Sequence, residues 1–133
     1  MENKIADAVI RQAAPEAHCI FHKVTPDPAV ALAAEGTAML RDFAPDTVVA
    51  LGGGSTIDSA KAIALGAVYD GDFWDFYCGK AKPVPALPHG CVLTIPAAGS
   101  EGSNSSVITK IDGNLKRGLG TEFHRPRFAV MNP

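Results

Sequence analysis

The sequence has few cysteines and no long apolar segment. Its three cysteines, Cys19, Cys78 and Cys91, are odd in number and widely spaced, and no Cys-x-x-Cys pair occurs. This pattern does not predict a disulfide framework, so we expect small buried thiols in a reducing cytoplasm. No apolar run approaches the roughly 18 residues that a membrane-spanning helix needs. The opening residues, MENKIADAVIRQ, also lack the uninterrupted apolar centre of a signal peptide.

The sequence also lacks an excess of charge of either sign. Twelve basic and fourteen acidic side chains give a formal net charge of −2. A surface of that kind has no overall attraction for nucleic acid or for anionic lipid, so we expect neither as a partner. Apolar residues make up 47% of the 133 residues, which suits one folded domain with its own core.

The order of apolar runs and breakers indicates alternating helices and strands. Amphipathic spacing predicts helices at 5–14, 29–43 and 56–68, and apolar or β-branched runs predict strands at 17–24, 47–51, 91–95, 106–110, 117–120 and 128–131. The run 47–51 has no alternation, which is typical of a parallel strand buried on both faces. Asp112-Gly113 is a strong β-hairpin signal. The predicted fold class is therefore α/β, a Rossmann-like layered fold with a mainly parallel sheet and a β-hairpin.

Helix caps and packing follow from the same pattern. We expect Asp27 to cap the helix at 29–43, and Ser55 to cap the next helix with Asp58 in the capping-box position. Asp72 is placed to cap a short helix in an aromatic-rich segment. Trp74 and its aromatic neighbours are expected to pack against the sheet.

The most informative segment is a strand, then Gly52-Gly53-Gly54-Ser55, then a helix. Glycines let the backbone approach a ligand closely and adopt positive φ. The N-terminus of the following helix presents N–H groups and the positive end of the helix dipole, which attract an anion. Such a loop lies at the carboxyl end of a strand, where open α/β folds bind ligands. We predict that it holds a diphosphate, with an ordinary structural glycine turn as the alternative.

Two standard phosphate motifs do not fit this loop. A P-loop needs Gly-x-x-x-x-Gly-Lys followed by Ser or Thr, and no register of the loop gives it. The dinucleotide fingerprint Gly-x-Gly-x-x-Gly needs glycine at position 57, where the chain has Ile57. The prediction of a phosphate site therefore depends on the strand–glycine–helix order alone.

A second glycine-containing loop, IPAAGSE at 95–101, follows another buried strand. In a parallel sheet both loops open on the same edge. Ser100 and the amide of Gly99 are then placed to donate to the same phosphate or ribose. An ordinary Ser/Gly loop is the alternative.

Together the two motifs resemble the iron-containing (group III) alcohol dehydrogenases. The matching segments are DTVVALGGGSTIDSAKAIA at 46–64 and CVLTIPAAGSEGSNSSVIT at 91–109. The tail KRGLGTEFHRPRFAVMNP is similar to the butanol dehydrogenase branch, and the resemblance covers nearly the whole chain. It implies the N-terminal domain of the dehydroquinate-synthase-like fold, present here in part. It also implies NAD(P)H-linked oxidation of primary alcohols or reduction of aldehydes, with hydride transfer at the nicotinamide.

The resemblance also implies roles for individual residues. The residues that it assigns to the pyrophosphate are Gly52, Gly53, Gly54 and Ser55. The residues that it assigns to the nucleotide cleft are Ala97, Ala98, Gly99 and Ser100. It places Asp58 near the nicotinamide and Lys116 near the ribose, although Lys116 also fits a solvated hairpin lysine. Many members have threonine where this chain has Ala98, which predicts the loss of one hydroxyl contact.

The family's metal implies sequence beyond this chain. By resemblance, Fe²⁺ or Zn²⁺ is held by an Asp and three His in a helical C-terminal domain, expected after Pro133. The family's first strand, which helps to choose between NAD and NADP, is expected before Met1. We therefore expect residues 1–133 to be a single, truncated NAD(P)-binding domain that is inactive alone, with no catalytic and no metal-binding residue. The full enzyme is expected to be a cytoplasmic homo-oligomer that acts on a small alcohol or aldehyde.

The four histidines do not change that expectation. His18 and His22 are four residues apart, but they fall in a predicted strand and have no acidic third ligand nearby. His89 and His124 flank prolines in predicted loops and do not match the family's ligands.

Two other functions stay open. One is a non-catalytic nucleotide-binding or interaction module. The other keeps the fold but has the chemistry of glycerol dehydrogenase or dehydroquinate synthase, against which the butanol-dehydrogenase-like tail argues.

Overall fold

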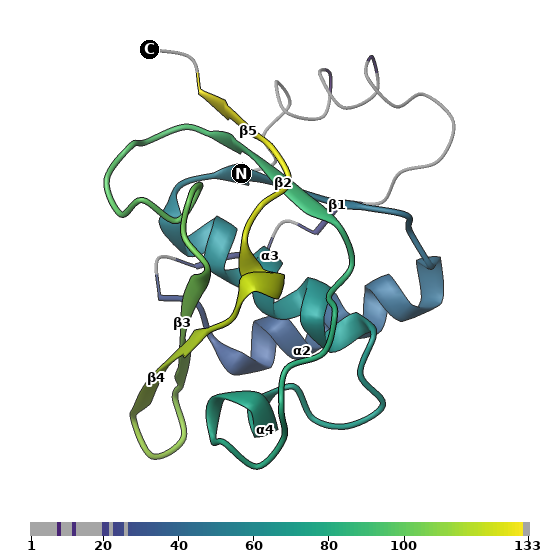
Figure 1. Cartoon of the computed structure of the whole chain (residues 1–133), viewed down its shortest axis with the longest axis vertical. Coiled ribbons are helices and arrows are strands. Elements are labelled where there is room, and N and C mark those ends of the chain that lie inside the picture. Colours follow the sequence, from purple (N-terminus) through teal and green to yellow (C-terminus); the bar gives the residue numbers. More distant parts are fainter. Residues whose placement is uncertain (1–7, 9–11, 13–19, 22, 26, 132–133) are drawn as a thin grey trace.

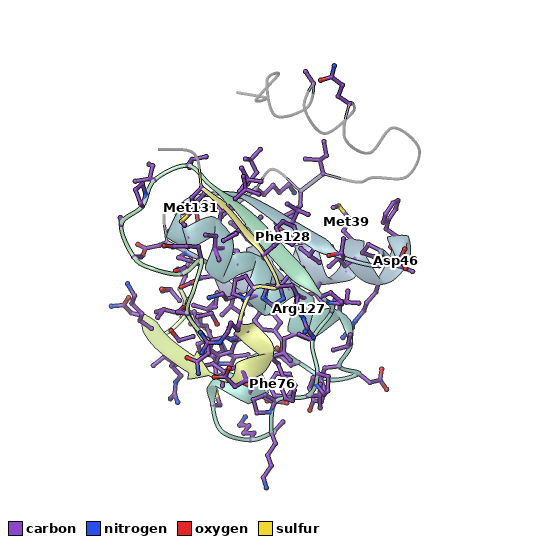
Figure 2. All side chains as sticks on the ribbon, turned by 45° about the horizontal axis from the view of Figure 1, so that its top comes forward. Met39, Asp46, Phe76, Arg127, Phe128 and Met131 are labelled. Carbon is purple, nitrogen blue, oxygen red and sulfur yellow. The ribbon has the colours of Figure 1, made fainter. Side chains whose placement is uncertain are left out.

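A three-stranded parallel sheet carries helices on one of its faces (Figure 1). The computed structural model describes residues 8, 12, 20–21, 23–25 and 27–131. Strands β1 (Val48–Gly52), β2 (His89–Leu93) and β5 (Ala129–Met131) pair in the order β1-β2-β5. Helix α3 (Gly54–Ala67) packs against β1 and β2, and helix α2 (Val30–Phe43) packs against α3. This arrangement confirms the predicted α/β class.

Most of the remaining elements lie on the other side of α3 from the sheet (Figure 1). Strands β3 (Ser105–Lys110) and β4 (Leu115–Gly120) form the predicted antiparallel hairpin. Its turn uses positive φ at Gly113 (79°) and Asn114 (50°). The short helix α4 (Trp74–Tyr77) and a 3₁₀ turn, η1 (Glu122–His124), lie against the hairpin. No helix in the described part of the chain is long and apolar enough to cross a membrane.

The buried apolar residues form two clusters, one on each side of α3. The smaller cluster, under the sheet, is Ala50, Ile57, Ala60, Cys91 and Leu93. The larger cluster joins α2, α3, α4 and β3: Ala33, Leu40, Ala62, Ile63, Leu65, Phe73, Trp74, Phe76, Tyr77 and Ile108. Within it Trp74 stacks on Tyr77, with ring centroids 5.6 Å apart. The aromatic segment is therefore core, although it packs against helices and the hairpin and not against the sheet.

The outer face of the sheet is apolar and exposed. Val49 is 52% exposed and Val130 is 50% exposed, and Val92 lies in register between Leu51 and Val130. The prediction that the first buried strand is covered on both faces is thus wrong for the described part of the chain. The α2–α3 layer covers one face, and no described element covers the other.

The predictions for residues 5–28 either lie outside the described residues or differ from the structure. The helix at 5–14 lies outside the described residues, apart from Ala8 and Gln12. The described residues of the expected strand at 17–24 are not in a strand. Helix α2 is capped by Ala29 without a side-chain bond, so the prediction for Asp27 is wrong. The reason is tertiary, because Ala29 bridges to Thr109 of β3 and stays extended.

Candidate functional site

The two predicted loops meet at the carboxyl edge of the sheet. Strands β1 and β2 end in register, and the N–H of Thr94 donates to the carbonyl oxygen of Gly52 at 3.1 Å. A Cβ on Gly54 would lie 3.1 Å from the Cβ of Ala98 and 3.4 Å from the Oγ of Ser100. The loop after β1 and the loop after β2 therefore pack directly against each other, as the parallel sheet predicted.

The glycines of the first loop have different surroundings. Gly52 has a φ of 157°, and a Cβ there would lie 2.5 Å from the Oγ1 of Thr56. The fold itself therefore requires glycine at position 52. Gly53 has an ordinary φ of −94°, and a Cβ there would meet nothing closer than the Cβ of Ile95 at 4.0 Å. The fold does not require glycine at position 53, where a Cβ would fit in ordinary van der Waals contact with Ile95.

Helix α3 begins inside this loop. Its N-cap is Gly53, without a side-chain capping bond, and its first turn contains no acidic residue. The N–H of Ile57 donates to the carbonyl oxygen of Gly53 at 3.1 Å, so the N–H groups of residues 54–56 precede the first helical bond. The prediction that Ser55 is the N-cap is wrong, because the helix begins two residues earlier, with Gly53 as its N-cap. The resulting helix end is electropositive and suits an anion.

Asp58 joins α3 to the hairpin. Its Oδ2 accepts a hydrogen bond from the backbone N–H of Val107 at 3.0 Å. Burial raises the pKa of the Asp58 carboxyl above its ordinary value, and the bond from Val107 opposes that shift. The structure thus shows a tethering role for Asp58, and its proximity to a nicotinamide stays a prediction.

Lys61 was missed by the sequence analysis. Its side chain is fully buried, and its Nζ lies 2.8, 3.0 and 2.8 Å from the carbonyl oxygens of Ser100, Ser103 and Ser105. A fourth acceptor is the Oγ of Ser103 at 3.1 Å. Burial lowers the pKa of Lys61, and the nearby carboxylate of Asp58 opposes that shift. One signal was present in the sequence, because Lys61 follows the core residue Ile57 by one helical turn.

A second buried polar chain runs behind the hairpin. The hydroxyl of Tyr77 lies 2.6 Å from the Oγ of Ser106, which lies 3.1 Å from the Nδ1 of His124. Burial lowers the pKa of His124 to about 4 and raises the pKa of Tyr77. His89, which we expected in a loop, begins β2 and is buried, with its Nε2 3.0 Å from the carbonyl oxygen of His124. These histidines are structural parts of the fold.

Lys116 lies on the exposed strand β4. Its ammonium is 3.9 Å from a carboxylate oxygen of Asp27, and both side chains are mostly exposed. This contact places Lys116 beside the segment that precedes α2. Its assignment to a cofactor ribose stays a prediction.

A cavity of about 430 Å³ lies at the opposite, amino-terminal end of β2 and β5. Among its lining residues are His89, Arg125 and Glu122. Arg125 is already paired with Glu122, through bonds of 2.9 and 3.1 Å. We therefore take the glycine loops, and not this cavity, as the candidate site. Within the described ranges, no group of three or more His, Cys, Asp or Glu side chains is arranged to hold a metal ion.

Comparisons with known proteins identify the family of this chain. The model of the family "Iron-containing alcohol dehydrogenase" matches residues 1–133. Probable NADH-dependent butanol dehydrogenase 1 of Bacillus subtilis is 44% identical over 110 residues, which are 83% of this chain and 28% of that protein. The crystal structure of NADH-dependent butanol dehydrogenase A from Thermotoga maritima has a TM-score of 0.81 at 37% identity, over 83% of this chain and 28% of that one.

A third relative was solved with a cofactor. Sulfoacetaldehyde reductase from Bifidobacterium kashiwanohense, in complex with NAD⁺, has a TM-score of 0.92 at 25% identity, over 99% of this chain and 35% of that one. The chain therefore spans roughly a third or less of the length of these relatives. The match over all 133 residues, and the relatives at 37% and 44% identity, show that this chain belongs to the iron-containing alcohol dehydrogenase family.

Proposed function

We propose that this chain is the dinucleotide-binding part of an NAD(P)-dependent, metal-dependent alcohol dehydrogenase that interconverts a primary alcohol and an aldehyde. The observation that carries the proposal is the meeting of two glycine loops, where Gly54 approaches Ala98 and Ser100 at the ends of adjacent parallel strands. The names of the relatives support NADH as the cofactor and a butanol-like alcohol as the substrate.

The residues present fit a dinucleotide. The absence of a side chain at Gly53 lets a diphosphate approach the backbone, and the first-turn N–H groups of α3 are placed to donate to it. Ser100 lies beside Gly54 and is buried, and its hydroxyl also bonds to the carboxylate of Asp58, so it borders the site from the second loop. When bound, the nicotinamide supplies the hydride-transfer chemistry. The described residues offer no set of metal ligands, so we assign no catalytic step to a metal in this chain.

The same proposal includes a cytoplasmic, homo-oligomeric enzyme with a small alcohol or aldehyde as its substrate. Cys78 and Cys91 are free thiols, which suits a reducing compartment. The exposed apolar face of the sheet, at Val49 and Val130, suits burial in an assembly. The net charge of −2 favours neither nucleic acid nor an anionic membrane as a partner.

A pair of glycine substitutions tests the proposal. Gly53→Ala adds a Cβ that fits in ordinary contact with Ile95, so the melting temperature should fall by no more than about 5 °C, the cost of alanine at an N-cap. Calorimetric titration with NADH should nonetheless show at least a tenfold weaker affinity, about 1.4 kcal/mol, because the methyl group displaces the diphosphate from the amides.

Gly52→Ala is the matched control. Its Cβ would collide with Thr56, so the melting temperature of this variant should fall further than that of Gly53→Ala. If Gly53→Ala binds NADH as tightly as the parent chain, or if the parent chain does not bind NADH, the proposed site is wrong.

A further inference from the structure

The buried ammonium of Lys61 is paired mainly with backbone carbonyl oxygens. A buried cation is costly unless its donors are paired, and Lys61 has three N–H donors facing four oxygen acceptors. Three of these acceptors are backbone carbonyls, at Ser100, Ser103 and Ser105. Lys61 therefore fixes the course of a backbone segment and does not depend on a carboxylate for its pairing.

That segment is the continuation of the second glycine loop. It runs from the end of that loop into β3, and its first anchored residue is Ser100. The carbonyl oxygen of Ser100 accepts from Lys61, and the Oγ of Ser100 faces Gly54. Lys61 itself lies on α3, whose N-terminus is the first glycine loop. One side chain thus connects the element that carries the first loop to the backbone of the second.

We propose that Lys61 is a positioning residue for the dinucleotide, which holds residues 100–105 against α3 so that the second loop is formed before the cofactor arrives. The inference rests on the proposed function, because it assigns Lys61 a role in the same site. A loop that is already ordered does not lose conformational freedom on binding, and this preserves affinity. Lys61 acts through Ser100 and does not itself contact the ligand.

The test compares Lys61→Met with Leu65→Ala in the full 133-residue chain. Methionine keeps the apolar stem of Lys61 but removes the ammonium. Leu65 is fully buried in the larger cluster, so its truncation lowers stability without touching the loop. Two readouts are taken well below both melting temperatures: hydrogen–deuterium exchange of the amides of 99–105, and NADH affinity by calorimetry.

Lys61→Met should speed exchange in 99–105 at least tenfold and weaken NADH binding at least tenfold. Leu65→Ala should leave both within about twofold of the parent chain, although its melting temperature falls. Ser103→Ala, which removes one acceptor of Lys61 and the bonds of this hydroxyl to the backbone of Ser105, but no buried charge, should give a smaller change of the same kind, about two- to fivefold. If Lys61→Met does not fold, Ser103→Ala takes its place in the test.

The inference is overturned if Lys61→Met, or in its place Ser103→Ala, binds NADH like the parent, or if Leu65→Ala weakens binding as much. A parent chain that does not bind NADH would contradict the proposed function instead. In that case the exchange data would still report whether Lys61 orders the loop.

Discussion

At the scale of single residues, the fold requires glycine at position 52 but not at the adjacent position 53. Gly52 is required by its φ and by Thr56, whereas position 53 has an ordinary φ and room for a Cβ, so the fold gives no reason for glycine there. The sequence shows three equivalent glycines, so it could not distinguish them. The distinction depends on where Thr56 and Ile95 lie once α3 and β2 have packed.

Gly53→Asp is expected to separate stability from cofactor binding. Aspartate is a favoured N-cap, and its charge complements the helix dipole, so the free energy of unfolding should rise by about 1 kcal/mol. The same carboxylate would repel a diphosphate, so NADH binding should be lost. Urea unfolding and calorimetry measure the two effects. A variant that is more stable and still binds NADH would exclude the diphosphate from this helix end.

His124 should make the chain sensitive to acid. Because burial lowers the pKa of His124 to about 4, the unfolded chain binds a proton between pH 6.5 and 4 that the folded chain does not. Its contribution to stability is therefore complete above pH 6.5 and is lost as the pH falls towards 4, by about 2 kcal/mol at pH 4.5.

The control for this effect is His124→Gln, which keeps a polar group beside Ser106 but does not titrate. Asp58 acts in the opposite direction, since a carboxyl with a raised pKa stabilises the fold at acid pH. Urea unfolding at pH 7 and pH 4.5 should therefore be compared between parent and variant. Equal losses of stability in the two chains would show that His124 does not titrate as a buried group.

At the scale of elements, local signals predicted the strands and helices well and the contacts between them poorly. The run at 47–51, the glycines and the Asp-Gly turn are local features, and β1, α3 and the hairpin were all predicted from them. The partners of Lys61 lie between 39 and 44 residues further along the chain. No local pattern encodes such a contact, and the cap of α2 was mispredicted for the same reason, through Thr109.

The bond between Asp58 and Val107 should contribute measurably to stability. Asp58→Ala leaves the N–H of Val107 without this acceptor, which should cost about 1–3 kcal/mol. Asp58→Asn retains an oxygen acceptor and should cost less than about 1 kcal/mol. Urea unfolding of the two variants checks this. If alanine is tolerated as well as asparagine, then the carboxylate does not hold β3 against α3.

At the scale of the whole molecule, the outer face of the sheet is an exposed apolar surface. Parallel sheets are normally covered on both faces, and this one exposes Val49, Leu51 and Val130. We expect the chain to self-associate through this face. Sedimentation should give a mass above 13.8 kDa, and the double variant Val49→Ser, Val130→Ser should shift it towards the monomer. A parent chain that stays monomeric at high concentration would contradict this expectation.

We propose that two loops from adjacent strands together hold a dinucleotide. The most direct measurement is an NMR titration of the ¹⁵N-labelled chain with NADH, which follows every backbone amide. We expect changes in the amide chemical shifts of residues 53–57 and 97–101, and smaller changes at the residues in 102–105 that Lys61 holds. A shift at Lys116 would support its assignment to the ribose. Shifts confined to the cavity around His89 and Arg125, or no shifts at all, would contradict the account.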